Sequence, residues 1–298
     1  MTDRLRRFLF ESEPLRGHWL QLEESWAQAV EHQHYAPEVR RVLGEALAAA
    51  ALLAATLKFH GTLALQIAGG SGPLTMLIAQ ATHDQGLRAL ARVGEVDVTG
   101  LDFRALVGNA QLTVTLESDE RGGSWQGIVP LQGDSLAHCL EAYFATSEQL
   151  PTRVALAADE RRVGGLLLQK MPSPSAAGEA SEGRVRELWD EAGLLMATLA
   201  ADELLAIEPE SLLPRLFPGQ ELRLFEGQPV RFQCRCGRER VAGVLRSLGE
   251  AEVRDVLREQ GAVTVTCEFC QRPYRFDAVD VEGLFHAGPT EQGSTTIN

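Results

Sequence analysis

Several features of membrane and secreted proteins are missing from this sequence of 298 residues. Its most apolar stretch, Ala46 to Leu57, has about 12 residues and is too short to span a bilayer. Glu11 and Glu13 follow the N-terminus after only a few apolar residues, which is unlike a secretory signal peptide. Five cysteines, four of them clustered, are too few for a disulfide framework in a chain of this size. We therefore expect a soluble, cytoplasmic protein.

Positive charge is in short supply. The 28 Lys and Arg residues are outnumbered by 41 Asp and Glu residues, which gives a formal net charge of −13 at pH 7. A surface of that sign repels a phosphate backbone, so we do not expect nucleic acid to be a partner. The other proportions, 45% apolar and 23% charged, are those of a globular protein rather than a disordered or fibrous one. The length suits about two domains.

The sequence also lacks a nucleotide-binding motif. Its most glycine-rich run, Gly69 to Pro73, is not followed by the Gly-Lys-Ser/Thr that ends a phosphate-binding loop. A strand pattern follows it, which predicts a hairpin turn. The run Gly133-Asp134-Ser135 lacks the last glycine of a nucleophile elbow, so we expect Asp134 or Ser135 to cap a helix instead.

Residues 1–175 alternate between strand and helix patterns. Pro37 suits a first helical turn and begins a long Ala/Leu helix to about Phe59, and a second helix is expected from residue 134 or 135 to Leu150. The predicted strands are Arg4–Phe10, Leu15–Leu22, Thr62–Ala68, Leu74–Ala81, Arg88–Val93, Gln111–Glu117, Gln126–Leu131, Arg153–Ala158 and Gly165–Lys170. Because strands outnumber helices and short turns join them, we predict an α+β fold with one mixed β-sheet and a few long covering helices.

A run of small and polar residues from Pro172 to Gly183 predicts a flexible linker and a domain boundary. The following pattern, Val185–Ala206, is helical with leucines along one face, and the apolar residues continue to Phe217. Residues 176–231 are acidic, yet they carry too many leucines to remain exposed, so this stripe must dock on another surface. We interpret 176–231 as an acidic, partly helical and metastable linker.

Four cysteines form two closely spaced pairs in the last part of the chain. Cys234 and Cys236 form Cys-x-Cys, and about 30 residues later Cys267 and Cys270 form Cys-x-x-Cys. A Cys-x-x-Cys turn presents two thiolates to one ion, and zinc prefers a tetrahedron of four such ligands. We therefore predict that these four cysteines bind one Zn²⁺ per chain in the reduced state.

Residues 232–286 are too few to build more than a marginal core, so a metal would stabilise them. The apparent binding energy of structural zinc is roughly 10–16 kcal/mol, which exceeds the stability expected of so small a domain. Zinc keeps its sulfur ligands as thiolates, and neighbouring arginines such as Arg235, Arg238 and Arg272 can offset their charge. An oxidant that reaches the sulfurs should release zinc and unfold this domain. Residues 287–298 are expected to be a disordered tail.

The cysteine spacing resembles the zinc centre of the 33-kDa heat-shock protein family, which are bacterial redox-regulated holdase chaperones. The likeness covers nearly the whole chain. The segments that carry it are Thr56-Leu-Lys-Phe-His-Gly61, Leu106-Val-Gly-Asn109, Gln126-Gly-Ile-Val129, Leu140-Glu-Ala-Tyr-Phe-Ala-Thr-Ser-Glu-Gln-Leu-Pro-Thr-Arg153, Leu167-Leu-Gln-Lys-Met-Pro172 and Cys236-Gly-Arg-Glu-Arg240.

This resemblance implies an ATP-independent chaperone that is inactive while reduced and zinc-bound. Peroxide at elevated temperature, or hypochlorous acid, would join Cys234 to Cys236 and Cys267 to Cys270 in disulfides and release zinc. Residues 232–286 and the linker would then unfold, and residues 1–175 would bind unfolding client proteins as a homodimer. We expect no enzymatic turnover and no membrane partner. The longer loop between Cys267 and Cys270 closes with less strain, so that pair should oxidise first.

Two other functions are compatible with the same cysteines. Cys267 and Cys270 can be the centre of a thiol–disulfide oxidoreductase, although that chemistry needs an exposed cysteine of low pKa at a helix N-terminus. A zinc-ribbon transcription or translation factor would use the nearby arginines on nucleic acid, against the net charge. The fifth cysteine, Cys139, lies among apolar residues of a predicted helix and is expected to be a buried core residue.

Overall fold

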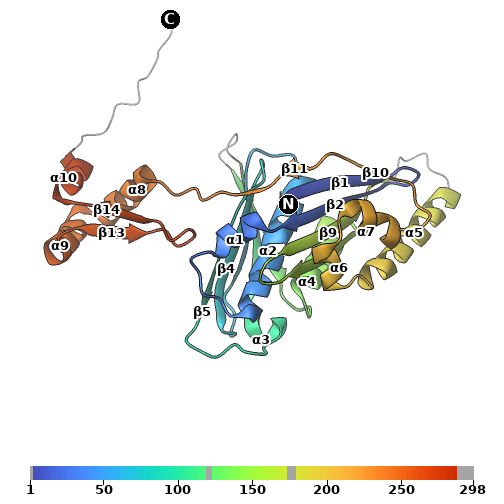
Figure 1. The fold of residues 1–298 in the computed structure, drawn as a ribbon, viewed down its shortest axis with the longest axis horizontal. Coiled ribbons are helices and arrows are strands. Elements are labelled where there is room, and N and C mark those ends of the chain that lie inside the picture. Colours follow the sequence, from blue (N-terminus) through green and yellow to red (C-terminus); the bar gives the residue numbers. More distant parts are fainter. Residues whose placement is uncertain (1–2, 119–122, 173–178, 287–298) are drawn as a thin grey trace, which may run out of the picture. The chain divides into compact units, whose positions relative to one another are not determined.

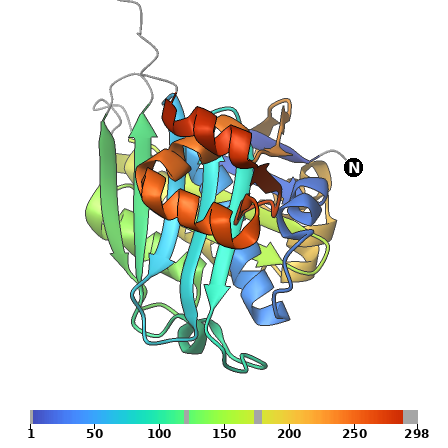
Figure 2. The ribbon, with the colours of Figure 1, turned by 90° about the vertical axis from the view of Figure 1, so that its left-hand side faces the viewer.

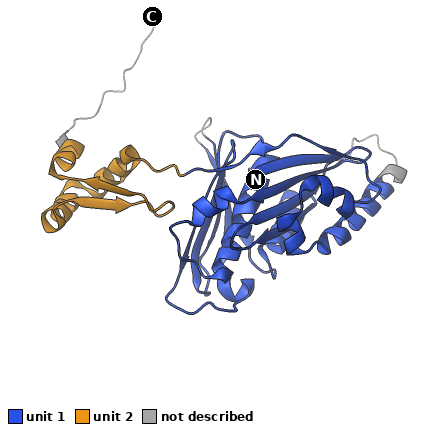
Figure 3. Cartoon of the chain, viewed as in Figure 1, with its two compact units in different colours: residues 1–233 blue, residues 234–298 orange. Residues whose placement is uncertain are grey.

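The computed structural model describes residues 3–118, 123–172 and 179–286. The chain forms two compact units, residues 1–233 and 234–298 (Figure 3). The predicted boundary near 172–183 does not separate compact units, because the described part of the expected linker packs within the first unit. Residues 173–178 and the expected tail 287–298 lie outside the described residues.

Sheet A in the first unit has six strands in the order β10-β1-β2-β9-β8, with β11 also paired to β1. Every pairing is antiparallel. The β1–β2 register sets Phe8 opposite Gly17, where a Cβ would lie 2.1 Å from Cζ of Phe8, so only glycine leaves room for this ring. The bounds are β1 (Arg4–Phe10), β2 (Leu15–Leu22), β8 (Thr152–Ala158), β9 (Val163–Lys170), β10 (Leu222–Leu224) and β11 (Gln228–Pro229).

Sheet B also has six strands, in the order β12-β5-β4-β3-β6-β7, and Figure 2 shows its main strands side by side. It is mixed, because β12 runs parallel to β5 while the other pairs are antiparallel. The turn from Gly69 to Pro73 joins β3 to β4, which confirms the predicted hairpin. The bounds are β3 (Gly61–Ala68), β4 (Leu74–Thr82), β5 (Gly86–Val93), β6 (Gln111–Ser118), β7 (Ser124–Pro130) and β12 (Arg231–Phe232).

Helix α2 (Pro37–Thr56) lies between the two sheets and contacts β2, β8 and β9 of sheet A as well as β3, β4 and β5 of sheet B. It begins with proline at its first turn and ends where Leu57 becomes extended. Its buried residues surround the whole helix, and the alanine-rich run from Ala48 to Ala51 leaves little space between helix and sheets. The expected α+β class is confirmed, but two sheets enclose this helix where one sheet was predicted.

Three shorter helices and one π-helical turn complete the inner part of the unit. Ser135 caps α4 by accepting a hydrogen bond from the backbone N–H of His138, so of the two expected caps it is the serine that acts. Cys139 is buried in the large core around α2, as predicted. The bounds are α1 (Glu24–Val30), α3 (Phe103–Val107), α4 (Leu136–Tyr143) and the π-turn (Phe144–Glu148).

Helices α5 (Glu179–Ala197), α6 (Ala201–Ala206) and α7 (Pro209–Leu216) cover one face of sheet A (Figure 1). We call residues 179–217 the cover. The single helix predicted over 185–206 is interrupted between Ala197 and Ala201. The apolar stripe docks as expected, forming a second core with Phe8, Phe10, Leu15, Trp19, Ala157, Leu166 and Leu168 of sheet A and with Leu188, Trp189, Ala192, Met196, Leu204, Leu205, Leu212, Leu213, Leu216 and Phe217 of the cover.

The second unit contains α8 (Arg238–Leu248), α9 (Glu250–Gln260), the hairpin β13 (Val263–Thr266) and β14 (Pro273–Phe276), and α10 (Ala278–His286). Gly249 and Gly261 adopt positive φ angles of 98° and 73° where α8 and α9 end. The buried apolar cluster of its described residues is small: Val241, Ala242, Leu245, Val253, Val263, Phe276, Val281 and Leu284. A core of this size needs additional stabilisation.

Candidate metal centre

The four paired cysteines come from two parts of the second unit, its first residues and the turn of its β-hairpin. Cys234 and Cys236 precede α8, whereas Cys267 and Cys270 form the turn between β13 and β14. This turn is closed by the Cys267 N–H donating to the Arg272 carbonyl at 3.0 Å and by the Gln271 N–H donating to the Cys267 carbonyl at 2.8 Å. Gln271 has a φ of 52°, a left-handed conformation suited to a tight turn.

All four sulfurs converge on one point. Sγ of Cys234 lies 3.3 Å from that of Cys236 and 3.6 Å from that of Cys267, while Cys236 and Cys270 are 3.3 Å apart. All the sulfurs lie within 4.8 Å of one another. Tetrahedral zinc with bonds of about 2.3 Å would separate its sulfurs by about 3.8 Å, so the cluster has the size and donors for one soft metal ion. Elsewhere in the described chain, no other group of three or more His, Cys, Asp or Glu side chains converges in this way.

The electrostatics of the cluster single out Cys236. The hydroxyl of Tyr274 donates to its sulfur at 3.1 Å. Burial alone would raise the pKa of Cys236, but hydrogen bonds from Tyr274 and the other thiols outweigh burial and lower the pKa to about 7. Burial raises the pKa of Cys234 and of Cys270. Of these three thiols, Cys236 is the one whose surroundings favour the thiolate.

Tyr274 was not predicted from the sequence. It follows Cys270 by four residues, and its strand β14 pairs it with Val265 on β13. Hydrogen bonds to metal ligands fix their orientation and charge, and they commonly matter for affinity. No sequence signal set this tyrosine apart, because it lies half-buried in a strand of four residues.

Two of the arginines near the cysteines in sequence make contacts with other groups of the second unit. Arg238 donates to the carbonyl of Arg275 at 2.7 Å, forms an ion pair with Asp280 at 2.7 Å and stacks over the Phe276 ring at 4.3 Å. Arg240 donates to the carbonyl of Arg235 at 2.8 Å. Their described contacts therefore stabilise the local fold of the second unit.

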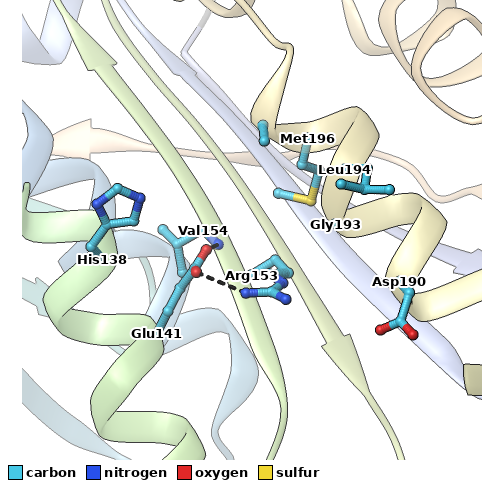
Figure 4. A pocket seen from close by; sticks show the side chains of 9 residues that line it. His138, Glu141, Arg153, Val154, Asp190, Gly193, Leu194 and Met196 are labelled. Atoms are coloured by element: carbon cyan, nitrogen blue, oxygen red, sulfur yellow. Dashed lines mark hydrogen bonds and ion pairs between the residues drawn. The ribbon is translucent and has the colours of Figure 1, made fainter.

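The first unit has a second notable feature, a seam where α5 of the cover meets helix α4 and strand β8. A hollow of about 460 Å³ lies there (Figure 4). Glu141 holds Arg153 through an ion pair of 3.2 Å, and the guanidinium of Arg153 lies 5.7 Å from the ring centre of Trp189 on α5. The same carboxylate accepts the backbone N–H of Val154 at 2.8 Å. This seam joins the cover to sheet A through one cation–π contact.

Comparison with known proteins identifies the family to which this fold and its four-cysteine cluster belong. A sequence model of the Hsp33 protein family matches residues 3–277. The chain belongs to the Hsp33 family. It is 43% identical to the 33 kDa chaperonin of Methylobacillus flagellatus, over 96% of this chain and 95% of that protein. It is 44% identical to the 33 kDa chaperonin of Azotobacter vinelandii, over 99% of this chain and 98% of that protein.

The Hsp33 fold is also recognised from structure. The crystal structure of the 33 kDa chaperonin, an Hsp33 homologue, from Thermotoga maritima matches with a TM-score of 0.80, covering 94% of this chain and 97% of that one at 23% identity. The chain is therefore a chaperone of the Hsp33 family, and its four clustered cysteines are placed to bind a metal or to form disulfides. Among the described residues, no helix is both long and apolar enough to cross a membrane.

Proposed function

We propose that this Hsp33-family chaperone is an ATP-independent holdase switched on by oxidation of its four clustered cysteines. In the reduced state Cys234, Cys236, Cys267 and Cys270 would hold one Zn²⁺, which supplies the cross-link that the small second unit needs. Two peroxide molecules, or two of hypochlorous acid, would take four electrons from four thiolates. The products are the disulfides Cys234–Cys236 and Cys267–Cys270, free zinc and the reduced oxidant.

The observation that carries this proposal is the second core beneath the cover. Phe8, Phe10 and Trp19 of sheet A are almost completely buried there, and their partners come from residues 179–217. Removal of the cover would bare a contiguous aromatic and aliphatic surface, which is what an unfolding client would bind. Residues 1–175 would then provide the client-binding and dimerisation part, and residues 176–231 the metastable part.

Loss of the metal is the proposed trigger because the second unit has little else to stabilise it. Its buried cluster is small, whereas structural zinc contributes roughly 10–16 kcal/mol of apparent binding energy. Oxidation of residues 232–286 would unfold them and free the chain that leads back to the cover. We further infer that the active form is a homodimer in the cytoplasm, with unfolded proteins as its clients.

Aggregation of an unfolded protein tests the switch. A chemically denatured client is diluted into reduced, zinc-loaded protein or into peroxide-treated protein at 43 °C, and light scattering is followed while released zinc is measured with a chromogenic chelator. We expect suppression only after oxidation, with one zinc released per chain. Equal suppression by both samples would make the protein a constitutive holdase, and none by either would refute the proposal.

A thiol–disulfide oxidoreductase is less well supported. Cys267 and Cys270 lie on a turn between two strands rather than at a helix N-terminus, and the thiol with the lowered pKa is Cys236 of the other pair. Catalytic reduction of insulin by the zinc-free protein would support that activity, and we expect none.

A further inference from the structure

The β1 edge of sheet A is closed by a short, extended segment of the chain. Residues 221–230, which we call the strap, run antiparallel along the whole of β1 and contribute β10 and β11. Three main-chain hydrogen bonds between strap and β1 span its length: Glu11 N–H to the Glu221 carbonyl at 3.0 Å, Phe225 N–H to the Arg7 carbonyl at 2.9 Å, and Val230 N–H to the Asp3 carbonyl at 3.2 Å. The odd-numbered residues of β1 therefore direct their backbone groups toward the strap.

The strap also contributes side chains to the second core. Leu222 and Leu224 alternate with the exposed Arg223 and pack against the apolar cluster under the cover. An extended segment with apolar residues at alternate positions thus already occupies this edge. It satisfies both the backbone groups of β1 and the apolar face beside them.

The strap is held loosely by comparison with the cover. Most of residues 221–229 are exposed or half-buried. Arg223 pairs with Glu11 at 3.0 Å on the surface, and the guanidinium of Arg7 lies 5.3 Å from the ring centre of Phe225. Surface ion pairs of this kind contribute little to stability. No strand is formed between β10 and β11, at residues 225–227, and the register against β1 shifts by one residue there, from Phe8 opposite Leu224 to Leu5 opposite Gln228.

Two of the other sheet edges do not offer a regulated site. On the far edge of sheet A, the Glu141 carboxylate already accepts the Val154 N–H of β8 at 2.8 Å. In sheet B, β7 pairs with no further strand in the described part of the chain, and Trp125 and Ile128 are exposed on it. A site on β7 would be open in both redox states. Release of the strap together with β12 would open the β1 edge and the short stretch of β5 that β12 covers, and the β1 edge is the longer of the two.

We propose that the β1 edge, once the strap has left it, binds an extended segment of an unfolded client as an added antiparallel strand. The client's backbone takes the hydrogen bonds now made by the strap, and alternate apolar side chains occupy the places of Leu222 and Leu224. Backbone pairing is independent of side-chain identity, so this mode suits clients of unrelated sequence. The inference rests on the proposed holdase function and specifies the surface that carries it.

Amide hydrogen exchange in the full-length chain tests this assignment. The amides of Leu9 and Glu11 face the strap, whereas that of Phe8 faces β2 and is the internal control. We expect Leu9 and Glu11 to be protected in the reduced protein, to exchange at least about tenfold faster after oxidation, and to regain protection when reduced, carboxymethylated α-lactalbumin is added. Phe8 should stay protected throughout.

Peptide competition distinguishes backbone pairing from simple apolar contact. A synthetic peptide of residues 221–230 should displace α-lactalbumin from the oxidised chain. The matched control carries N-methyl groups on Arg223 and Phe225, keeping every side chain but removing two donors that face β1. We expect the control to compete about tenfold less well, because each main-chain hydrogen bond adds a modest net stabilisation.

Several results would overturn the inference. One is aggregation suppressed by the oxidised chain without renewed protection of Leu9 and Glu11. Others are unchanged protection on oxidation, or equal competition by the two peptides. Protection that returns with rising protein concentration alone would assign the edge to a second copy of the chain. If the oxidised chain suppresses no aggregation, the holdase proposal itself fails, which the scattering assay reports separately.

Discussion

Replacing Phe217 by alanine should release the cover without any oxidation. Phe217 is 2% exposed and closes the second core against β1, with its ring centre 5.2 Å from that of Phe10 in an edge-on arrangement and 6.3 Å from that of Phe8. A Phe→Ala change in a packed core costs about 3–5 kcal/mol. When the cover is undocked, the Phe217 ring is exposed to water and its loss changes little. The substitution therefore destabilises the docked state by nearly the whole of this free energy.

That cost corresponds to a shift of about 150- to 5,000-fold in the docking equilibrium of the cover. We expect reduced, zinc-loaded Phe217→Ala protein to suppress the aggregation of a denatured client, where the reduced parent protein does not. Limited proteolysis should show cleavage within residues 179–217, and the zinc content should stay at one per chain. The matched control is Leu194→Ala on α5, because Leu194 is 73% exposed and should change nothing.

The prediction is contradicted if protease cleaves the cover of reduced Phe217→Ala protein but this protein does not suppress aggregation. That result would mean that the surface beneath the cover is not what binds clients. If the cover of Phe217→Ala resists protease, Leu213→Ala is added to weaken the same core further. An inactive double variant with a cleaved cover would refute the reasoning equally.

Three further predictions follow from individual side chains. Tyr274→Phe removes the hydroxyl that donates to Cys236 and should weaken zinc binding about tenfold in a chelator competition, with α-helix content unchanged; unaltered affinity would contradict a role for this hydrogen bond. Burial and the nearby Arg16 and Arg7 lower the pKa of His18 from 6.5 to about 4, so the unfolded chain binds the proton more readily. Stability should therefore fall as the pH drops from about 6.5 toward 4, by up to about 3 kcal/mol, and denaturant titrations of His18→Gln should lack this part of the loss. Cys139→Ala should retain zinc binding and redox switching, because Cys139 is buried in the core around α2; loss of either would give it a role in the switch.

The regular elements of this fold were accessible from the sequence because each is long enough to show a period. The predicted strands Arg4–Phe10 and Leu15–Leu22 coincide with β1 and β2, and the helix beginning at Pro37 ends within a few residues of its predicted end. The cysteine cluster was predictable for a different reason. Two close pairs of cysteines within one short segment are typical of a four-sulfur metal site, and the convergence of their sulfurs was confirmed.

The number of sheets was missed because pairing between strands is non-local. The sequence pattern of α2 indicates more than one sheet, because a helix that is apolar on all sides must be covered on all sides. The strap was not predicted because its strands β10 and β11 have only three and two residues, too few to show alternation. Tyr274 was missed because a half-buried tyrosine in a short strand carries no distinguishing pattern.

The distribution of contacts along residues 179–286 suggests why heat and oxidation should act together. In the proposed mechanism the second unit depends on its metal, which oxidation would remove. The chain next to it is weakly held: Gln233, just before Cys234, donates its N–H to the Leu87 carbonyl at 2.8 Å, and Arg231 pairs with Asp84 at the surface.

The cover is a different case, because its stability comes from buried aromatic and aliphatic contacts within the first unit. Oxidation can therefore free the strap and the second unit while the cover stays docked on sheet A. Undocking the cover orders water around a large apolar surface but releases the conformational entropy of about 40 residues, a balance that rising temperature shifts toward the open form. Full activation should then require oxidant and heat together at wild-type cover stability. Phe217→Ala already bares the surface beneath the cover in the reduced protein, and oxidant should complete its activation by freeing the strap without a need for heat.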